Sequence, residues 1–223
     1  MVPETNNKLF ILGAGSQGGK AAVLANMLGL SVEGFVSTEP AGTIKHGLPV
    51  LGTIQTLPDL FQDPKNSFHI AIGEPFYRKV TANSLADSGT PMVYPTLMHP
   101  SAYLAPGTKI GEGTFVGVRA ILENEAETGI HCIIDSGAIV EHNCLIGNYV
   151  NISPGATLAG NVKVGSGTII GVGAIIREKV TIGANALIGA GAVVVNDVPD
   201  FAVVAGIPAK VLRYREESSK NLK

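Results

Sequence analysis

A repeat of six residues constrains this chain more than any other feature of its sequence. From Leu104 to Val194 every sixth residue is a branched aliphatic, with Thr128 as the one exception. The residue four places later is always Thr, Ala, Val or Cys, and the residue directly after the aliphatic is often Gly. A period of six matches neither an α-helix nor an amphipathic strand, and it is typical of hexapeptide repeats.

The repeat predicts a triangular parallel β-helix. Each hexad forms one short strand and one turn, in which the aliphatic and the small residue point inward and glycine tolerates the turn. Three hexads close a coil, and successive coils stack at about 4.8 Å, the usual spacing between strands. A narrow prism leaves no room for large rings, which agrees with the absence of tryptophan. Cys132 and Cys144 occupy small-residue positions, so we expect both thiols to be free and buried.

Residues 8–97 follow another pattern, in which strand-like and helix-like segments alternate. Such alternation is typical of a small parallel α/β unit. We expect strands at 8–15, 31–37, 48–52, 67–73 and 91–96, and helices at 19–29 and 77–89. The expected organisation is a Rossmann-like domain with a small parallel sheet at 1–98, a β-helix at 99–212 and a solvated tail at 213–223.

Charge and apolar patterning exclude several classes of function. The net charge is −2, only 15% of residues are charged, and no Lys/Arg run occurs, so we expect no nucleic-acid partner. No apolar run is long enough to span a membrane, and the start "MVPETNNKLFIL" lacks the basic segment and apolar core of a secretion signal. Two cysteines are too few for a disulfide framework. We therefore expect a cytoplasmic protein.

The segment "GAGSQG" places Gly13, Gly15 and Gly18 directly after the first expected strand and at the start of a helix. In that context glycines allow a phosphate to approach the backbone. A full dinucleotide fold needs a longer chain, so a mononucleotide is the expected ligand. Glu39 follows the second strand and is a candidate for contact with a ribose hydroxyl. The alternative is a tight strand-to-helix turn without a ligand.

Two of the five histidines lie inside the repeat, His131 and His142. Hexapeptide carbonic anhydrases bind zinc through three histidines, two of them five residues apart. Here the two histidines are eleven residues apart and the repeat holds no third, so we expect no metal site.

His142 occupies the third place of its hexad, which is an outward-pointing corner of the predicted coil. The same place one coil above is Gly160, and Asn143 stacks on Glu125 one coil below. A histidine beside a glycine at such a corner could hold a reacting group next to a backbone N–H. The alternative is a solvated corner histidine without a function.

Over nearly its whole length the chain resembles the bacterial nucleotide-sugar acyltransferases of the left-handed β-helix class, the PglD/NeuD-like proteins. The resemblance lies in "LFILGAGSQGGKAA", "IAIGEPFYRK", "HPSA", "GAIVEHNCLIGNYVNISPGATLAGNVKVG" and "VPDFAVVAGIPAKVLR". It implies a left-handed parallel β-helix, acetyl-CoA as cosubstrate, and a homotrimer with active sites between subunits. It further implies N-acetylation of a nucleotide-linked 4-amino-4,6-dideoxy sugar.

The resemblance also implies roles for residues at matching positions. His142 would be the general base, and the N–H of Gly160 would donate to the oxyanion. The implied contacts with acetyl-CoA are Asn151, Gly160, Val172, Ala190, Pro208 and Lys210. The implied contacts with the nucleotide sugar are Gly13, Gly15, Ser16, Gln17, Ser37, Glu39 and Gly73.

Three positions depart from the family pattern. Asn143 stands where an acidic residue usually follows the histidine, Asn151 where many members have a second histidine, and Gln17 where the glycine-rich turn has a histidine. An asparagine can orient the imidazole but cannot stabilise its cationic form as a carboxylate does. Glu125 or Glu141 is a candidate for supplying the missing charge. Otherwise the substrate amine would already be largely deprotonated.

These observations predict an acetyl-CoA-dependent N-acetyltransferase that acts on a nucleotide-linked amino sugar in surface-glycan or O-antigen biosynthesis. The main alternative is a sugar O-acetyltransferase of the kind that modifies sialic acids, although an alkoxide is harder to generate than a free amine. An alternative from another class is a nucleotide-sugar-binding trimer with impaired catalysis, because three polar positions depart from the pattern together.

Overall fold

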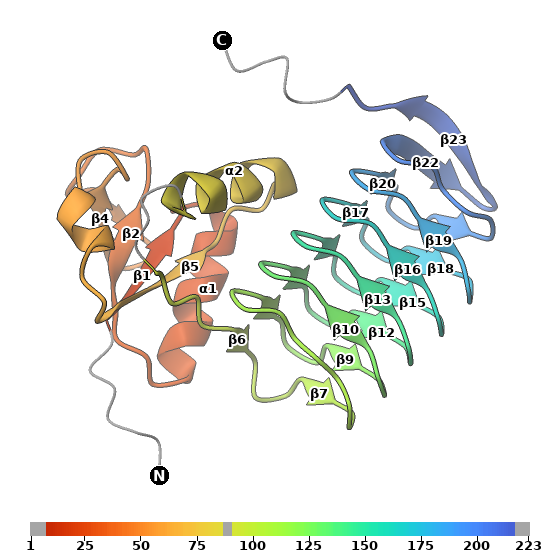
Figure 1. Cartoon of the computed structure of the whole chain (residues 1–223), viewed down its shortest axis with the longest axis horizontal. Helices are drawn as coiled ribbons and strands as arrows, with labels where there is room; N and C mark the ends of the chain where they lie inside the picture. The colour runs from red at the N-terminus through yellow and green to blue at the C-terminus, as the bar shows by residue number, and fades with distance from the viewer. Residues whose placement is uncertain (1–7, 87–90, 217–223) are drawn as a thin grey trace. The chain divides into compact units, whose positions relative to one another are not determined.

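The computed structural model describes residues 8–86 and 91–216 (Figure 1). The chain divides into two compact units, Met1–Leu97 and Met98–Lys223. Within the described residues, no helix is both long enough and apolar enough to cross a lipid bilayer.

The first unit contains a five-stranded sheet with the order β3-β4-β2-β1-β5. Its four longer strands are parallel, whereas β3 pairs with β4 in the antiparallel direction. Helices α1 and α2 lie on opposite faces of the sheet (Figure 1). The strands are β1 (Lys8–Leu12), β2 (Val32–Val36), β3 (Ile44–Lys45), β4 (Leu48–Gly52) and β5 (Asn66–Ile70). The helices are α1 (Ser16–Met27), the 3₁₀ helix η1 (Pro58–Phe61) and α2 (Pro75–Ala86).

Helices on both faces of the sheet bury strands β1 and β5. Every residue of β5 is buried, and so are all residues of β1 after Lys8. The continuous apolar run of β1 is typical of parallel strands between two helical layers, and β5 also buries the polar side chains of Asn66, Ser67 and His69. The small parallel α/β unit predicted from the sequence is confirmed.

One predicted strand of this unit is wrong. Residues 91–96 form no strand, and only Val93 makes an isolated parallel bridge, to Ser67. The two prolines of the segment lack the N–H that a strand donates to its neighbour, so the ladder cannot continue through them. The short elements β3 and η1 were not predicted, and residues 87–89 of the second expected helix lie outside the described residues.

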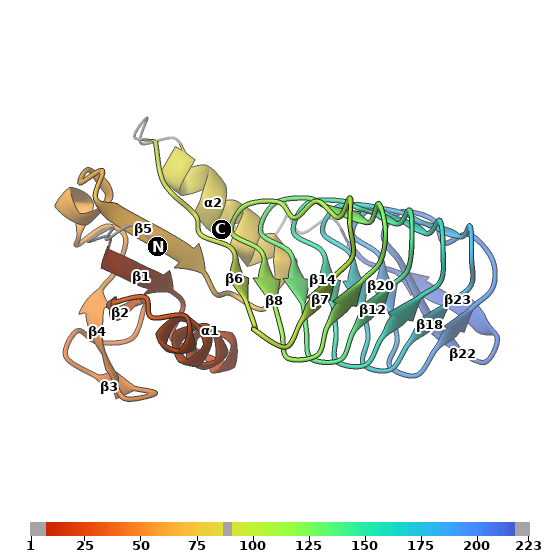
Figure 2. The ribbon, with the colours of Figure 1, turned by 90° about the horizontal axis from the view of Figure 1, so that it is seen from below.

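The second unit is a left-handed parallel β-helix built from three sheets (Figure 2). Strands eighteen residues apart pair in register, as Ile121, Ile139 and Thr157 do in successive coils, which confirms the predicted hexapeptide architecture. The four-stranded sheet contains β10 (Glu127–Thr128), β13 (Leu145–Ile146), β16 (Lys163–Val164) and β19 (Thr181–Ile182). The six-stranded sheet contains β7 (Tyr103–Leu104), β9 (Ile121–Leu122), β12 (Ile139–Val140), β15 (Thr157–Leu158), β18 (Ile175–Ile176) and β21 (Val193–Val194). The eight-stranded sheet contains β6 (Leu97–Met98), β8 (Phe115–Val116), β11 (Ile133–Ile134), β14 (Asn151–Ile152), β17 (Ile169–Ile170), β20 (Leu187–Ile188), β22 (Ala202–Gly206) and β23 (Ala209–Tyr214).

The core of the β-helix is a stack of small and branched aliphatic side chains. The repeating residue of each hexad from Val116 to Val194 is buried. Each fully buried aliphatic of this size stabilises the fold by roughly 1.5–3 kcal/mol. Cys132 and Cys144 are free and lie in this core, as predicted.

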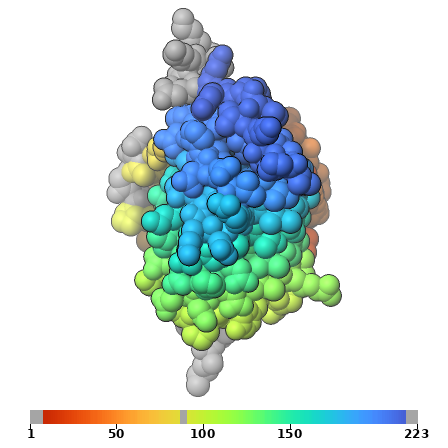
Figure 3. All heavy atoms as spheres, turned by 90° about the vertical axis from the view of Figure 1, so that its right-hand side faces the viewer, coloured from red at the N-terminus to blue at the C-terminus, as the bar shows by residue number. Residues whose placement is uncertain are grey.

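A hairpin of β22 and β23 follows the last coil. β22 pairs with β20 and extends the eight-stranded sheet, and β23 returns antiparallel to it. Residues near the C-terminus, blue in Figure 3, cover part of this end of the β-helix. β23 ends at Tyr214, so the strand continues into the segment 213–223 that was expected to be a tail, of which residues 217–223 lie outside the described residues.

Candidate active site

His142 lies exposed in the turn between β12 and β13, at a corner of the coil. Its Nδ1 lies 3.0 Å from Oδ1 of Asn143. An amide oxygen accepts hydrogen bonds and cannot donate them, so this contact places the proton on Nδ1 and leaves the Nε2 lone pair available. Asn143 has a φ of 59°, a left-handed conformation that asparagine adopts more readily than most residues.

Gly160 lies one coil above the imidazole and makes room for it. A Cβ atom on Gly160 would lie 2.5 Å from Nε2 of His142, which is closer than real contacts allow. The missing side chain therefore brings the basic nitrogen against the backbone. Residues 142–143 and 160 are termed the histidine corner below.

The N–H of Gly160 is the second feature of the histidine corner. In several other hexads the N–H of the residue two places after the repeating inward residue forms a hydrogen bond. The N–H groups of Ile130, Asn148 and Ala184 donate to side-chain oxygens at 3.1, 3.0 and 2.7 Å. Within the described residues, the N–H of Gly160 donates to no group. The corner thus presents an unused donor beside Nε2 of His142.

The residues expected to contact CoA lie on other parts of the β-helix. Val172 and Ala190 stack on each other, exposed, at the corner that follows the eight-stranded sheet, and Asn151 lies on the outward face of that sheet. The six-stranded sheet separates this corner from the histidine corner, so a single chain does not bring the two groups together. Pro208 and Lys210 are exposed in the β22–β23 hairpin.

A cleft of about 680 Å³ opens in the first unit at the carboxyl ends of β1, β2 and β5. Six of the seven residues expected to contact the nucleotide sugar line it: Gly13, Gly15, Ser16, Gln17, Ser37 and Gly73. Glu39 is not part of the lining, because its carboxylate instead pairs with Nζ of Lys45 at 3.0 Å.

The glycines of this cleft fall into two groups. Gly13 has a φ of 107°, and a Cβ atom on Gly18 would collide with the carbonyl oxygen of Gly13, so the turn itself requires both glycines. A Cβ atom on Gly15 or Gly73 would meet nothing within 4 Å, and neither residue has a positive φ. The absence of a side chain at Gly15 and Gly73 therefore keeps the cleft open, and the fold itself does not require glycine at either position.

Comparisons with known proteins agree with this architecture. Residues 8–85 match the family model of the PglD N-terminal domain, and residues 125–160 and 161–196 match that of the bacterial transferase hexapeptide (six repeats). The crystal structure of PerB from Caulobacter crescentus, in complex with CoA and GDP-perosamine, is 33% identical in sequence. It covers 92% of this chain and 97% of its own, with a TM-score of 0.86. The chain belongs to this family of hexapeptide-repeat sugar acetyltransferases.

Two further relatives of the family are similar over nearly the whole chain. The acetyltransferase domain of PglB from Neisseria gonorrhoeae, in complex with acetyl coenzyme A, is 37% identical, covers 93% of this chain and 100% of its own, and has a TM-score of 0.86. WeeI from Acinetobacter baumannii is 28% identical, with coverage of 93% and 100% and a TM-score of 0.82. A comparison with curated proteins returned no match.

In this sugar acetyltransferase the two candidate carboxylates, Glu125 and Glu141, lie near groups other than the imidazole. Glu125 extends one coil down, where its Oε1 occupies the space that a Cβ atom on Gly107 would need. Glu141 lies close enough to Cys144 to add to the rise in the pKa of that thiol, to about 11, which burial mainly causes. In the described part of the chain no hydrogen bond joins either carboxylate to His142. The imidazole is therefore oriented by an amide and not by a carboxylate.

A groove of about 630 Å³ on the four-stranded sheet was not predicted. It lies on the strands that follow the histidine corner in the chain, and its lining includes the outward residues Leu145, Lys163 and Thr181. These residues directly precede the inward aliphatics, so the register places them on one face. Their mixed composition carries no signal of a ligand, and the sequence therefore did not reveal the groove.

Arg78 is a further residue of the first unit that the sequence did not single out. It is 1% exposed, and its Nη1 donates to the carbonyl oxygens of Ile72 and Gly73 at 2.6 and 3.1 Å. Both carbonyls belong to the loop that lines the cleft, so Arg78 holds one wall of the cleft in place. The polar residues that line the cleft and were not predicted are Thr38, Thr53, Gln55, Tyr77 and Thr81.

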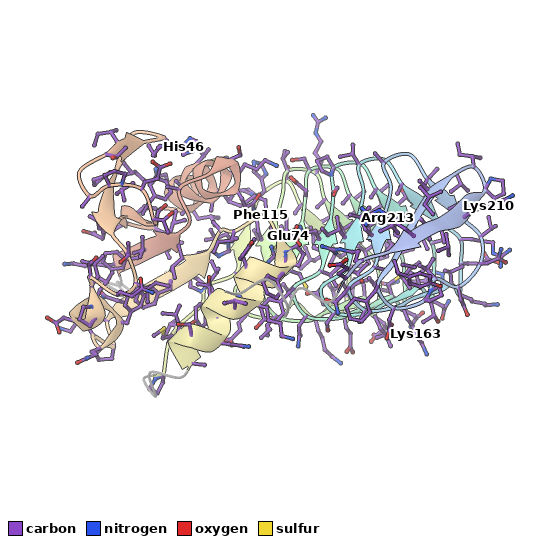
Figure 4. All side chains as sticks on the ribbon, turned by 90° about the horizontal axis from the view of Figure 1, so that it is seen from above. His46, Glu74, Phe115, Lys163, Lys210 and Arg213 are labelled. Atoms are coloured by element: carbon purple, nitrogen blue, oxygen red, sulfur yellow. The ribbon has the colours of Figure 1, made fainter. Side chains whose placement is uncertain are left out.

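Two of the other histidines, His46 and His131, pack against neighbouring groups. Across residues 8–86 and 91–216, no group of three His, Cys, Asp or Glu side chains is arranged to hold a metal ion. His131 is buried and stacks on the ring of Tyr149, with ring centroids 5.6 Å apart. The ring of His46, labelled in Figure 4, lies over Gly19 of α1.

Proposed function

We propose that the protein is an acetyl-CoA-dependent N-acetyltransferase that acts on the amino group of a nucleotide-linked 4-amino-4,6-dideoxy sugar. The observation that carries the proposal is the histidine corner, where Nε2 of His142 lies against Gly160 and the N–H of Gly160 is unused within the described residues. The relatives support the substrate class, because PerB was solved with CoA and GDP-perosamine and the PglB domain with acetyl coenzyme A. We place the reaction in the cytoplasm, where acetyl-CoA is available, and in surface-glycan or O-antigen biosynthesis.

His142 acts as the general base in this proposal. The amine nitrogen of the sugar attacks the thioester carbonyl carbon, and Nε2 accepts the proton that the nitrogen loses as the C–N bond forms. The N–H of Gly160 donates to the carbonyl oxygen as that oxygen becomes negative. Collapse of the tetrahedral intermediate breaks the C–S bond, and the imidazolium returns its proton to the CoA thiolate.

Asn143 favours an amine over a hydroxyl as the acceptor. Its amide orients the imidazole but stabilises the imidazolium less than a carboxylate would. A neutral amine attacks with its own lone pair and needs only a weak base, whereas a hydroxyl must lose its proton to attack. The pair therefore suits N-acetylation better than O-acetylation.

The cleft of the first unit is proposed to hold the nucleotide. The N-terminus of α1 contributes Gly15, Ser16 and Gln17 to the lining, and backbone N–H groups at a helix N-terminus suit a diphosphate. Gln17 adds a buried Nε2 that has no hydrogen-bond partner among the described residues. None of the lining residues is charged, so the phosphates would depend on these donors.

A homotrimer would bring the two separated corners together. The outward residues of the six-stranded sheet form a mostly apolar ladder, and Ile175 within it is 49% exposed in the single chain. The two corners flank this sheet. A three-fold arrangement that buries the sheet near its axis would place the histidine corner of one chain beside Val172 and Ala190 of the next. The ladder consists of Ile121, Ile139, Thr157, Ile175 and Val193.

Release of free CoA thiol from acetyl-CoA, measured with a panel of UDP-, dTDP- and GDP-linked amino sugars, tests the proposed reaction. We expect release with at least one amino sugar, and a fall in kcat of at least about 100-fold in His142→Ala. Release with a hydroxyl acceptor such as a sialic acid, but with no amino sugar, would indicate an O-acetyltransferase. Binding of a nucleotide sugar without any thiol release would indicate a binding protein and contradict the proposal.

A further inference from the structure

Arg78 is a buried cation of α2 that the proposed reaction does not use directly. Tyr77 and Thr81, four residues apart on one face of this helix, line the cleft of the first unit. Arg78 is 1% exposed and is not part of the lining. Burial of a guanidinium is costly unless its N–H groups find acceptors, so the acceptors of Arg78 indicate which part of the structure depends on it.

Two acceptors of Arg78 are consecutive carbonyl groups of the loop between β5 and α2. Its Nη1 donates to the carbonyl oxygens of Ile72 and Gly73 at 2.6 and 3.1 Å. Nη1 carries two hydrogens, so each carbonyl can receive one of them. Ile72 and Gly73 line the cleft, and their oxygens are thus held toward a residue that does not line it.

The planar peptide unit turns this contact into a direction for the backbone N–H groups. In a trans peptide unit the C=O and the N–H point in opposite directions. The units that join Ile72 to Gly73 and Gly73 to Glu74 hold their oxygens toward Arg78, so their N–H groups point away from it. Successive N–H groups on one side of a loop form a surface that suits an anion.

This loop lies next to the turn at which the diphosphate is proposed to bind. A Cβ atom on Gly13 would lie 2.9 Å from the carbonyl oxygen of Ala71 and 3.2 Å from Cγ1 of Ile72. The turn that leads into α1 and the loop that leads into α2 are therefore in close contact, at the carboxyl ends of the paired strands β1 and β5. A loop with its carbonyl oxygens toward the phosphates would oppose their binding, because both groups carry negative charge.

We propose that Arg78 is a positioning residue that keeps the N–H side of this loop toward the phosphates of the nucleotide sugar. The inference rests on the proposed function, because it takes the diphosphate of that substrate as the ligand. Arg78 acts through Ile72 and Gly73 and contacts neither the substrate nor the reacting atoms. Loss of its guanidinium should therefore weaken binding of the diphosphate and leave the nucleoside, acetyl-CoA and the chemical step unaffected.

Calorimetric binding of UDP, dTDP and GDP, each compared with its own nucleoside, tests this role. Arg78→Met keeps a long side chain that favours a helix, but it has no donor for the two carbonyls. The Kd of the tightest-binding diphosphate should rise about 10-fold to 100-fold, and the Kd of the matching nucleoside should change by less than about twofold.

An equal rise in Kd for the diphosphate and its nucleoside would show a general distortion of the cleft and overturn the role of Arg78. An unchanged Kd for the diphosphate would do the same. If the nucleoside does not bind wild type, the phosphates carry the whole affinity, and the result with the diphosphate is decisive by itself.

Arg78→Lys is the conservative variant. Its ammonium keeps the charge and can donate to a carbonyl, but it lacks the fixed fork of a guanidinium. Its Kd for the diphosphate should lie between those of wild type and Arg78→Met. If Arg78→Met shows no cooperative thermal unfolding, Arg78→Lys takes its place, and a wild-type Kd in that variant would contradict the role.

Lys79→Met is the matched control. Lys79 is the next residue of α2 and is exposed, so this variant removes the same charge from the same helix without removing a donor to Ile72 or Gly73. Its Kd for the diphosphate should equal that of wild type. A rise as large as that in Arg78→Met would assign the effect to net charge and not to the loop.

Steady-state kinetics separate this inference from the proposed function. Arg78→Met should raise KM for the nucleotide sugar and should change kcat and KM for acetyl-CoA by less than about twofold, because only ground-state binding is affected. An active wild type whose KM for the nucleotide sugar is unaffected by Arg78→Met would overturn the role of Arg78 alone. A wild type that binds none of the three diphosphates and releases no thiol with any amino sugar would overturn the proposed function as well.

Discussion

The pair formed by His142 and Asn143 has a defined geometry but lacks a negative charge. The contact between Nδ1 and the amide oxygen orients the ring at 3.0 Å. Glu125 extends to the coil below, and Glu141 makes no hydrogen bond to the pair within the described residues. The imidazolium that forms in the proposed reaction thus lacks the stabilisation that a paired carboxylate gives, which suits an amine acceptor.

Replacing Asn143 by aspartate should raise kcat about tenfold, because a carboxylate here stabilises the imidazolium that forms as the proton is taken. The measurement is kcat at saturating acetyl-CoA and nucleotide sugar over a series of pH values. Asn161→Asp adds the same charge one coil above and should leave kcat unchanged. No increase in Asn143→Asp would contradict the role assigned to this pair.

Burial of Cys144 should make stability fall at alkaline pH. Burial, with a smaller contribution from Glu141, raises the pKa of this thiol from 9.0 to about 11. The folded state therefore holds the proton more tightly than the unfolded state, and this contribution is complete below the unfolded pKa and is lost as the pH rises through the folded pKa. We expect a loss of roughly 2 kcal/mol in the free energy of unfolding over that window.

Urea unfolding of wild type and Cys144→Ala across the same alkaline range measures this loss. Alanine fits the position, because Ala126 occupies it one coil below. Lysines and tyrosines titrate in both proteins, so the difference between the two curves isolates the thiol. Parallel curves would show that Cys144 does not contribute.

At the scale of elements, the glycines at and near the turn between β1 and α1 have two different roles. The fold requires some of them, and ligand binding in the cleft requires others. Gly18→Ala should lower the free energy of unfolding by about 1–3 kcal/mol, because the new Cβ collides with the carbonyl oxygen of Gly13. Gly15→Ala and Gly73→Ala should change it by less than about 1 kcal/mol. Both should nevertheless weaken nucleotide-sugar binding at least about tenfold, since each methyl group fills the cleft.

Thermal unfolding and calorimetric binding of the nucleotide sugar measure the two effects separately. Wild-type affinity in both Gly15→Ala and Gly73→Ala would place the nucleotide elsewhere. A stable Gly18→Ala would mean that the close approach of α1 to β1 is not required by the turn.

At the scale of the whole molecule, an active site between chains predicts recovery of activity on mixing. His142→Ala lacks the base, and Val172→Trp blocks the opposite corner, so each variant alone should be inactive. In mixed trimers formed by refolding the two variants together at equal amounts, about a quarter of the sites should combine an intact histidine corner with an intact partner corner.

Thiol release by the mixture should therefore reach about a quarter of the wild-type rate. Sedimentation of each variant, which should show the same assembly as wild type, is the control for correct folding. A mixture without activity, formed from correctly assembled variants, would contradict a site shared between chains.

The sequence by itself determined the β-helix and the position of its corners. Because the repeat has a constant period of six, each hexad packs in the same way. The inward residues, the outward residues and the residues that stack in successive coils can therefore be assigned by counting along the sequence. His142 and Gly160 could therefore be placed at one corner, one above the other, without any knowledge of long-range contacts. The segment 91–96 shows the limit of local pattern, because its apolar residues suggested a strand that its prolines prevent.

Only the tertiary structure decided which side chains line the cleft, which extend to a neighbouring coil and which pair with one another. Glu39 pairs with Lys45 and leaves the cleft, Glu125 extends to the coil below, and Arg78 holds a loop six residues before it. Arg213 reaches the outward face only because β23 returns along β22 and extends the eight-stranded sheet. Such outcomes depend on side-chain conformation and on pairing between segments that no local period encodes.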